Sequence, residues 1–130
     1  MLSTLFIQNY AIIAELEIQF SGNLNIITGE TGAGKSILVG ALGLVLGDRA
    51  DNSVLRDVSK KAIVEATFRN QGKPLIQELL LKWDIDAADE LVLRREVNAN
   101  GKSRAFINDT PVNLSQLQSM AGALVDMHQQ

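Results

Sequence analysis

The chain has 130 residues, of which 46% are hydrophobic and 21% are charged, and its net charge is −3. These values predict one domain with an apolar core and exclude a disordered, low-complexity or collagen-like chain. Since there is no cysteine and only one histidine (His128), the sequence also excludes disulfides, thiolate metal sites and a multi-histidine metal site within one chain. The negative balance gives no general reason to expect nucleic-acid binding.

No targeting or membrane segment is expected. The first basic residue is Lys35, so the N-terminus lacks the basic region of a secretory signal. The longest apolar run, Ile37–Leu46, has about half the length that a bilayer span needs. We therefore expect a soluble cytoplasmic protein, and the absence of cysteine fits a reducing compartment.

The first part of the chain predicts strands followed by a helix. Alternating residues predict strands over Leu5–Gln8, with a turn beginning at Asn9-Tyr10, and over Glu15–Phe20, and Leu24–Thr28 predicts a short buried strand. The run Ile37–Leu46 is apolar on nearly all sides, which predicts a buried helix, and Gly47 is placed to end it. A polar loop follows.

The second part predicts further strands and two helices. The expected elements are a strand over Ala62–Phe68, a helix from Pro74 with a stripe of Leu75, Ile76, Leu79 and Leu80, strands over Leu91–Val97 and Ser103–Ile107, and a helix after Asn113. Asn100-Gly101 predicts a tight hairpin turn in which both residues have positive φ, and Asn108-Asp109 predicts another turn. Asn113 and Gln116 have the spacing of a capping box. This order predicts an α/β domain whose mixed sheet has a substantial antiparallel part.

One motif carries chemistry. Residues Gly29, Glu30, Thr31, Gly32, Ala33, Gly34, Lys35 and Ser36 match the phosphate-binding loop, or Walker A motif, G-x-x-x-x-G-K-[ST]. The glycines let backbone N–H groups turn inward toward phosphate oxygens, and the following helix directs its positive end at the same anion. Lys35 supplies an ammonium for the β- and γ-phosphates, and Ser36 supplies a hydroxyl ligand for Mg²⁺. The alternative is a glycine-rich turn that contains Lys-Ser by chance, but the motif follows an expected strand and opens an expected helix.

The residues around the motif resemble a known family. Thr28–Ser36 resembles many ATPases of the ABC superfamily, and the opening strands resemble those of SMC-like heads. Three further stretches resemble the RecN-like family of DNA repair and recombination ATPases. They are Ala41–Asp51, Leu93–Arg95 together with Gly101–Asn108, and Leu124–His128. The similarity covers essentially the whole chain.

This resemblance implies a fold of the ABC/SMC-head type that uses ATP and Mg²⁺ in recombinational repair of double-strand breaks. Heads of this family are split, and hydrolysis needs an acidic Walker B strand and a Ser-Gly-Gly signature, neither of which occurs here. We therefore expect residues 1–130 to be the N-terminal half of a head, incomplete as a catalyst. The implied partners are the C-terminal half of the same head, a second head that sandwiches ATP, and DNA; the implied location is the bacterial cytoplasm, in association with the nucleoid.

The resemblance also implies roles for residues outside the loop. In the pattern Asp-Ile-His-x-Gln, the glutamine that senses Mg²⁺ and γ-phosphate falls on Gln130; the alternative is an unstructured chain end. Arg56 matches an arginine that reaches the nucleotide; the alternative is a solvated loop arginine. Asn9 and Tyr10 lie where the family holds adenine, and for Tyr10 packing is the alternative.

Two charged stretches each allow two interpretations. The basic residues Arg94, Arg95, Lys102 and Arg104 either contact DNA phosphates or protect a strand edge, and alternation puts Arg94 and Arg95 on opposite faces. The acidic residues of 84–90 form either a metal site or an acidic surface loop, and their spacing does not fit a calcium loop.

Two rival functions remain open. A small kinase or GTPase would show regular strand–helix alternation, and a GTPase would carry Asn-Lys-x-Asp, which is absent. The other rival is a non-catalytic nucleotide-binding module.

Overall fold

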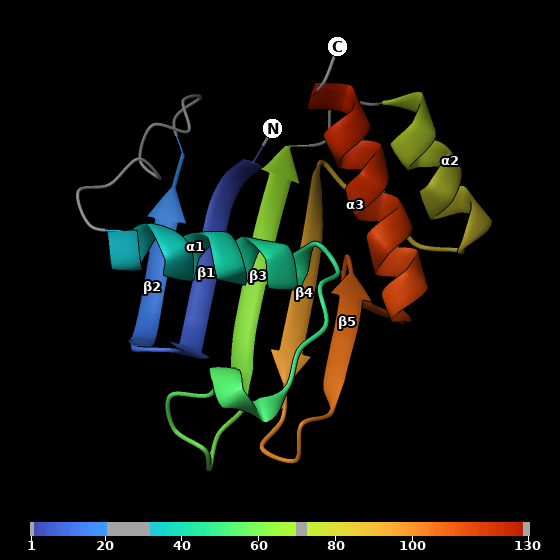
Figure 1. Ribbon diagram of the computed structural model, residues 1–130. Coiled ribbons are helices and arrows are strands. Elements are labelled where there is room, and N and C mark those ends of the chain that lie inside the picture. The colour runs from blue at the N-terminus through green and yellow to red at the C-terminus, as the bar shows by residue number, and fades with distance from the viewer. Residues whose placement is uncertain (1, 21–31, 70–72, 129–130) are drawn as a thin grey trace.

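The computed structural model contains one antiparallel sheet with helices on one face (Figure 1). It describes residues 2–20, 32–69 and 73–128, and for residues 32, 33 and 125–128 it describes the backbone only. The strands are β1 (Leu2–Tyr10), β2 (Ile13–Gln19), β3 (Ala62–Arg69), β4 (Glu90–Val97), β5 (Ser103–Ile107) and β6 (Thr110–Val112), and the helices are α1 (Gly32–Val45), η2 (Asn52–Val54, a 3₁₀ turn), α2 (Pro74–Lys82) and α3 (Leu114–His128). The sheet order is β2-β1-β3-β4-β5-β6. The strand expected over residues 24–28 lies outside the described residues.

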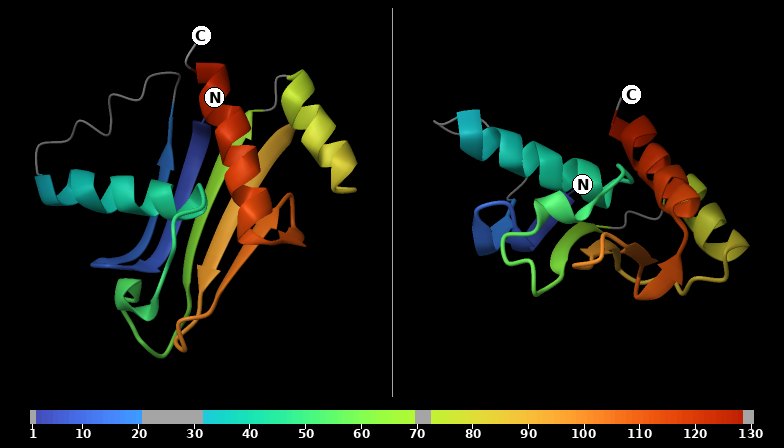
Figure 2. Two further views of the ribbon diagram at one scale, coloured as in Figure 1. Left: turned by 45° about the vertical axis from the view of Figure 1, so that its right-hand side comes forward. Right: turned by 60° about the horizontal axis from the view of Figure 1, so that its bottom comes forward.

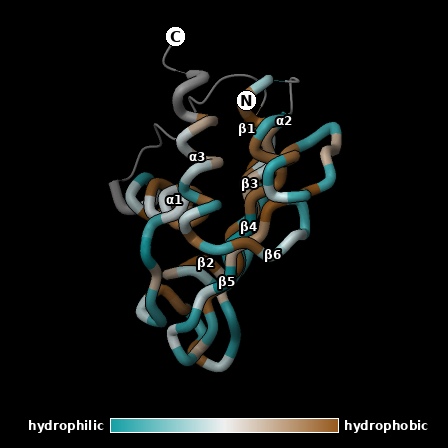
Figure 3. Tube along the Cα trace, turned by 90° about the vertical axis from the view of Figure 1, so that its right-hand side faces the viewer, coloured by the Kyte–Doolittle hydropathy of each residue, from teal (hydrophilic) through white to brown (hydrophobic). Residues whose placement is uncertain are grey.

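The core lies between the sheet and the helices. Alternate strand residues such as Leu5, Ile7, Val64 and Leu93 are fully buried on the helix-bearing face. In Figure 1, α1 crosses this face from β2 to β4, and α3 lies beside it with α2 next to α3. Figure 2 shows that α1, α2 and α3 lie on the same face of the sheet and that no described α-helix covers the opposite face. Figure 3 shows polar residues gathered in the loops at one end. The predicted α/β class with an antiparallel part is confirmed.

Helix α1 differs from the expected buried helix. It begins at Gly32 and lies on the sheet with one side only, so that Val39 is 54% exposed. Its inward side, which includes Ala41, Leu44 and Val45, is buried. The prediction of burial on all sides was wrong because the sheet covers one side of α1 and no other described element covers its opposite side.

Both predicted turns are present, but the turn with positive φ at two residues is Asn108-Asp109 and not Asn100-Gly101. Asn108 and Asp109, with φ of 48° and 66°, form the two-residue turn between β5 and β6. At the β4–β5 connection only Gly101 has positive φ (85°), and the loop is closed by the hydrogen bond from the Asn98 N–H to the Lys102 carbonyl, 2.8 Å. The expectation of positive φ at both Asn100 and Gly101 was therefore wrong, because this hairpin uses a three-residue loop with glycine at its last position.

The predicted helix starts are confirmed. The Asn113 side chain accepts a hydrogen bond from the Gln116 N–H (2.8 Å), and the Gln116 side chain accepts one from the Asn113 N–H (2.9 Å), which is the predicted capping box. Helix α2 begins at Pro74 and buries Ile76 and Leu80, whereas Leu75 is 43% exposed and lies outside the expected stripe.

The helix-free face of the sheet carries a cluster of ion pairs. Arg94 contacts Glu96 at 2.8 Å and Glu65 at 3.3 Å, and Lys61 contacts Glu96 at 3.3 Å. Burial raises the pKa of Glu96, but the hydrogen bonds from Arg94 and Lys61 outweigh it and hold this pKa below its ordinary value. With Arg94 paired and Arg95 buried, the four basic residues of the hairpin do not form a patch for DNA phosphate.

Replacing Leu93 by alanine should lower the free energy of unfolding by about 2–5 kcal/mol, because it opens a cavity in the fully buried core. The matched control is Val92→Ala, one residue earlier on the helix-free face, which should cost less than about 1.5 kcal/mol. Urea unfolding of both variants measures the difference, and equal losses would contradict this placement of the core.

Replacing Glu96 by glutamine should flatten the acid side of the stability curve. The lowered pKa means that ionised Glu96 stabilises the fold above its ordinary value of 4.5, and that this contribution is lost as the pH falls through the lower folded value. The free energy of unfolding, measured between about pH 6 and pH 2, should therefore fall less steeply in Glu96→Gln than in the wild type. Glu17→Gln on the exposed edge strand is the control, and an equal flattening there would refute the assignment to Glu96.

Candidate functional site

The described half of the phosphate-loop motif forms the first turn of α1. The helix begins at Gly32, and both Lys35 and Ser36 are exposed on this turn, while residues 29–31 lie outside the described residues. The first N–H groups of an α-helix have no partner within the helix and carry partial positive charge. The turn therefore brings backbone donors, an ammonium group and a hydroxyl group to one end of one helix, a donor set that suits a phosphate with its Mg²⁺.

A close contact seats α1 on the sheet. A Cβ atom at Gly40 would lie 2.7 Å from the Tyr10 hydroxyl oxygen, so any other residue here would require the tyrosine side chain or the helix to shift. Tyr10 ends β1 and is 9% exposed, and burial raises the pKa of its phenol. Packing against α1 is thus the role that the structure gives Tyr10.

The other end of α1 closes in a Schellman turn. The Asp48 N–H donates to the Gly43 carbonyl (3.0 Å) and the Gly47 N–H donates to the Leu44 carbonyl (3.2 Å). Gly47 has a φ of 116°, a conformation that favours glycine, which confirms the predicted stop. The Gln118 amide of α3 donates to the Gly47 carbonyl at 2.9 Å.

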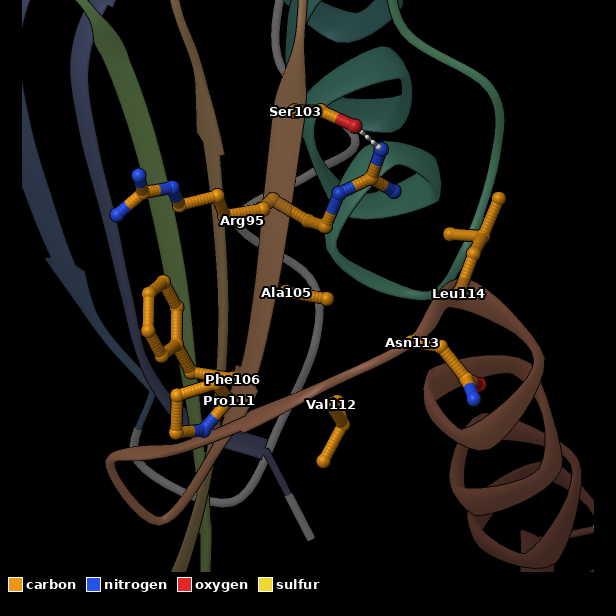
Figure 4. Close-up of a pocket in the computed structure, with 9 residues that line it drawn as sticks. Arg95, Ser103, Ala105, Phe106, Pro111, Val112, Asn113 and Leu114 are labelled. Carbon is orange, nitrogen blue, oxygen red and sulfur yellow. Dashed lines mark hydrogen bonds between the residues drawn. The ribbon is translucent and has the colours of Figure 1, made fainter.

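Arg95 also forms hydrogen bonds to the turn that ends α1. One of its terminal nitrogens, Nη1, donates to the carbonyls of Leu44 and Asp48, both at 2.8 Å, and Nη2 donates to the Ser103 hydroxyl at 3.1 Å. The residue is 1% exposed, and burial lowers the pKa of the guanidinium, an effect that Asp48 opposes. Figure 4 shows Arg95 and Ser103 on the same side of the strands, beside a pocket of about 360 Å³ at the end of α1 opposite to Lys35.

The Asn9 side chain forms hydrogen bonds to the backbone of the loop that carries Arg56. Its amide Nδ2 donates to the carbonyls of Asp57 (3.0 Å), Lys60 (3.0 Å) and Lys61 (3.3 Å), and its Oδ1 accepts from the Asp57 N–H at 2.7 Å. Asn9 is 6% exposed and has a φ of 56°, which asparagine tolerates better than most residues. The structure thus uses the Asn9 side chain to position the loop.

The other sequence-predicted residues are placed only in part. Arg56 is exposed, with no side-chain hydrogen bond to any residue that the structure describes, and it lines a pocket of about 280 Å³ with Lys60 and Lys61. Gln130 lies outside the described residues, and of His128 only the backbone is described. The acidic residues of the 84–90 stretch are all exposed, as expected of an acidic surface. Within the described ranges no group of three or more acids or histidines could hold a metal ion.

Arg95 and the positioning role of Asn9 were missed from the sequence. For Arg95 the signal was present, since strand alternation puts it on the same face as Leu91, Leu93 and Val97. For Asn9 no local pattern indicates that its partners lie about fifty residues further along the chain.

A family model described as an AAA domain matches residues 4–124. Proteins described as DNA repair protein RecN match along the whole chain, with 42% identity in both Haemophilus influenzae and Vibrio cholerae and 37% in Bacillus subtilis. The chain spans about a quarter of the length of these relatives, 24% for the first two and 23% for the third.

Solved structures of SMC proteins share the fold. An SMC ATPase, from work on ATP-driven dimerization and DNA-stimulated activation of such ATPases, aligns with a TM-score of 0.72 at 23% identity, over 95% of this chain and 79% of that one. An Smc head bound to the C-winged helix domain of ScpA aligns with a TM-score of 0.69 at 21% identity, over 94% of this chain and 40% of that one. In the described residues, no helix has both the length and the apolar character required to cross a membrane.

Replacing Asn9 by alanine should lower the free energy of unfolding by about 2–4 kcal/mol, because it removes the partner of a partly buried N–H group and puts at positive φ a residue that tolerates this conformation less well than asparagine. Asn9→Gly relieves only the backbone and should fall between alanine and wild type. The control is Gln8→Ala, which removes a solvent-exposed hydrogen bond to Glu15 and should change stability by less than about 0.5 kcal/mol. Thermal unfolding measures all three, and equal stability of Asn9→Ala and Gln8→Ala would contradict the role of Asn9.

Proposed function

The chain belongs to the AAA domain family, and we propose that it is the N-terminal half of an SMC-type ATPase head that binds ATP with Mg²⁺ through Gly29–Ser36. The observation that carries the proposal is the placement of Lys35 and Ser36 on the exposed first turn of a helix whose opposite end is fixed to the sheet. The glycine-rich loop with a following helix is the arrangement that binds nucleotide phosphates.

Each part of the loop has a task in phosphoryl transfer. Lys35 neutralises charge on the β- and γ-phosphates, and Ser36 is the Mg²⁺ ligand among the described residues. When bound, Mg²⁺ supplies further neutralisation of the phosphate oxygens. The residues of this half bind and orient the nucleotide, and none of the described ones is placed to abstract a proton from water. We propose contacts of Arg56 with the nucleotide and of Gln130 with Mg²⁺ as further parts of the site.

Hydrolysis requires a second half. The RecN relatives are about four times as long as this chain, and the sequence holds neither a Walker B strand nor a Ser-Gly-Gly signature. The C-terminal half of the head and a second, ATP-sandwiched head are therefore the proposed partners. An SMC ATPase with this fold is described as dimerizing under the drive of ATP, which supports this assembly.

The biological role follows from the relatives. Proteins 34–42% identical to this chain are named DNA repair protein RecN, and we propose that the complete protein acts on DNA in recombinational repair in the bacterial cytoplasm. In the described hairpin Arg94 is ion-paired and Arg95 is buried, which leaves Lys102 and Arg104 as its exposed basic residues.

Titrating Mg-ATP into the chain by calorimetry tests the binding site. We expect saturable binding that Lys35→Ala weakens about tenfold to a hundredfold, because a charge-assisted hydrogen bond to phosphate is worth about 1.5–3 kcal/mol. The matched control is Lys82→Ala, an exposed lysine in the last turn of α2, which should bind like the wild type. A folded wild-type chain with no saturable binding would refute the site in this chain, and equal affinity for Mg-GTP would favour another class of phosphate-loop protein. ATP hydrolysis by the chain alone, lost in Lys35→Ala, would refute the split catalytic site.

A further inference from the structure

The turn that ends α1 accepts hydrogen bonds from β4 and α3, and β5 binds the arginine of β4 that makes two of them. Arg95 of β4 donates to the carbonyls of Leu44 and Asp48, each at 2.8 Å, and its second terminal nitrogen donates to Ser103 of β5 at 3.1 Å. Gln118 of α3 donates to the Gly47 carbonyl between those two, at 2.9 Å. Three carbonyls at the end of one helix, those of Leu44, Gly47 and Asp48, thus accept hydrogen bonds from side chains of β4 and α3, and β5 binds the arginine.

The stability of the fold does not by itself explain why an arginine occupies position 95. Removing a guanidinium from water is costly, and buried ion or cation sites are often replaced by apolar residues of similar size without loss of stability. Arg95 is 1% exposed, and its Nε has no hydrogen-bond partner among the residues that the structure describes. What the guanidinium supplies, and an apolar side chain cannot, is a planar group whose Nη1 binds two carbonyl oxygens of the turn while its Nη2 binds the Ser103 hydroxyl of β5.

The end of α1 that Arg95 binds and the end that carries Lys35 belong to one helix, which moves as a rigid body. Leu44 follows Lys35 by nine residues, which corresponds to about 14 Å along a helix axis. Between the two ends α1 rests on the sheet with one side only, and Val39 on the other side is 54% exposed. Gly40 lies close to the Tyr10 hydroxyl, and the hydrogen bond to Leu44 holds the far end of α1 over β4.

We propose that Arg95 is a positioning residue of the nucleotide site: by fixing the end of α1 to β4 and β5, it sets the direction of the helix and hence the position of Lys35 and Ser36. This inference rests on the proposed function for its consequence in nucleotide affinity. Its structural content, a coupling between the two ends of α1, stands apart from that function.

Hydrogen exchange of the nucleotide-free chain tests the coupling. In Arg95→Met, which keeps the approximate volume and removes the fork, amide exchange should rise about fivefold or more at residues 36–40, as well as at 44–48 beside the lost hydrogen bonds. Exchange at Val64 and Ala66 in the buried part of β3 reports global opening and should stay unchanged. The matched control is Arg94→Met, the neighbouring arginine on the helix-free face, which should leave residues 36–40 unchanged.

Calorimetry with Mg-ATP tests the consequence. Affinity should fall about five- to tenfold in Arg95→Met and stay within twofold in Arg94→Met, and Arg95→Lys, whose ammonium group reaches fewer acceptors, should lie between. If Arg95→Met does not fold, Arg95→Lys and Ser103→Ala are measured in its place with the same expected directions. Faster exchange confined to residues 44–48, or spread equally to β3, would overturn the proposal. If the wild-type chain binds no nucleotide, the proposed function fails in this chain, while the exchange measurement still decides the coupling.

Discussion

Arg95 is a cation with almost no access to water, and its hydrogen bonds determine how the layers of this fold meet. Because a buried guanidinium must find acceptors inside the protein, the end of α1 and the hydroxyl of Ser103 have to come to it. Burial lowers the pKa of Arg95, yet a guanidinium stays protonated at any physiological pH, so this requirement is permanent. Strand β4, strand β5 and helix α1 therefore form one unit, which the Gln118 contact extends to α3.

The two ends of α1 have opposite character. At the C-terminal end the carbonyls are satisfied by the Schellman turn, by an arginine and by a glutamine, which match the negative end of the helix dipole. At the N-terminal end Lys35 and Ser36 face solvent. One end of this helix thus presents an ammonium and a hydroxyl to solvent, while its other end is held by the protein.

Sequence patterns predicted the elements better than their contacts. Period-two alternation located β3, β4 and β5 and put Arg94 and Arg95 on opposite faces, because register in a half-buried sheet follows the apolar pattern. It did not reveal that the inward arginine caps a helix, since its partners, Leu44 and Asp48, are distant in sequence. The turn error has a similar origin: Asn-Gly favours a two-residue hairpin, but loop length is set by the register of the flanking strands. A helix that is apolar all round predicts two covered sides, and the described residues cover one.

The pairing of β1 with β3 inside the sheet has a consequence for how the protein folds. Ile7 pairs with Val64, so this ladder closes a long stretch of chain that contains the whole phosphate-binding motif. The hairpins β1–β2, β4–β5 and β5–β6 are local and close rapidly, whereas a pairing between residues so far apart must first overcome the entropy of a large loop. Helix α1 rests on β1, β3 and β4 together, and therefore acquires its platform only when that late pairing is made. During synthesis the proposed nucleotide site would thus be assembled after β4 has left the ribosome, even though its motif emerges much earlier.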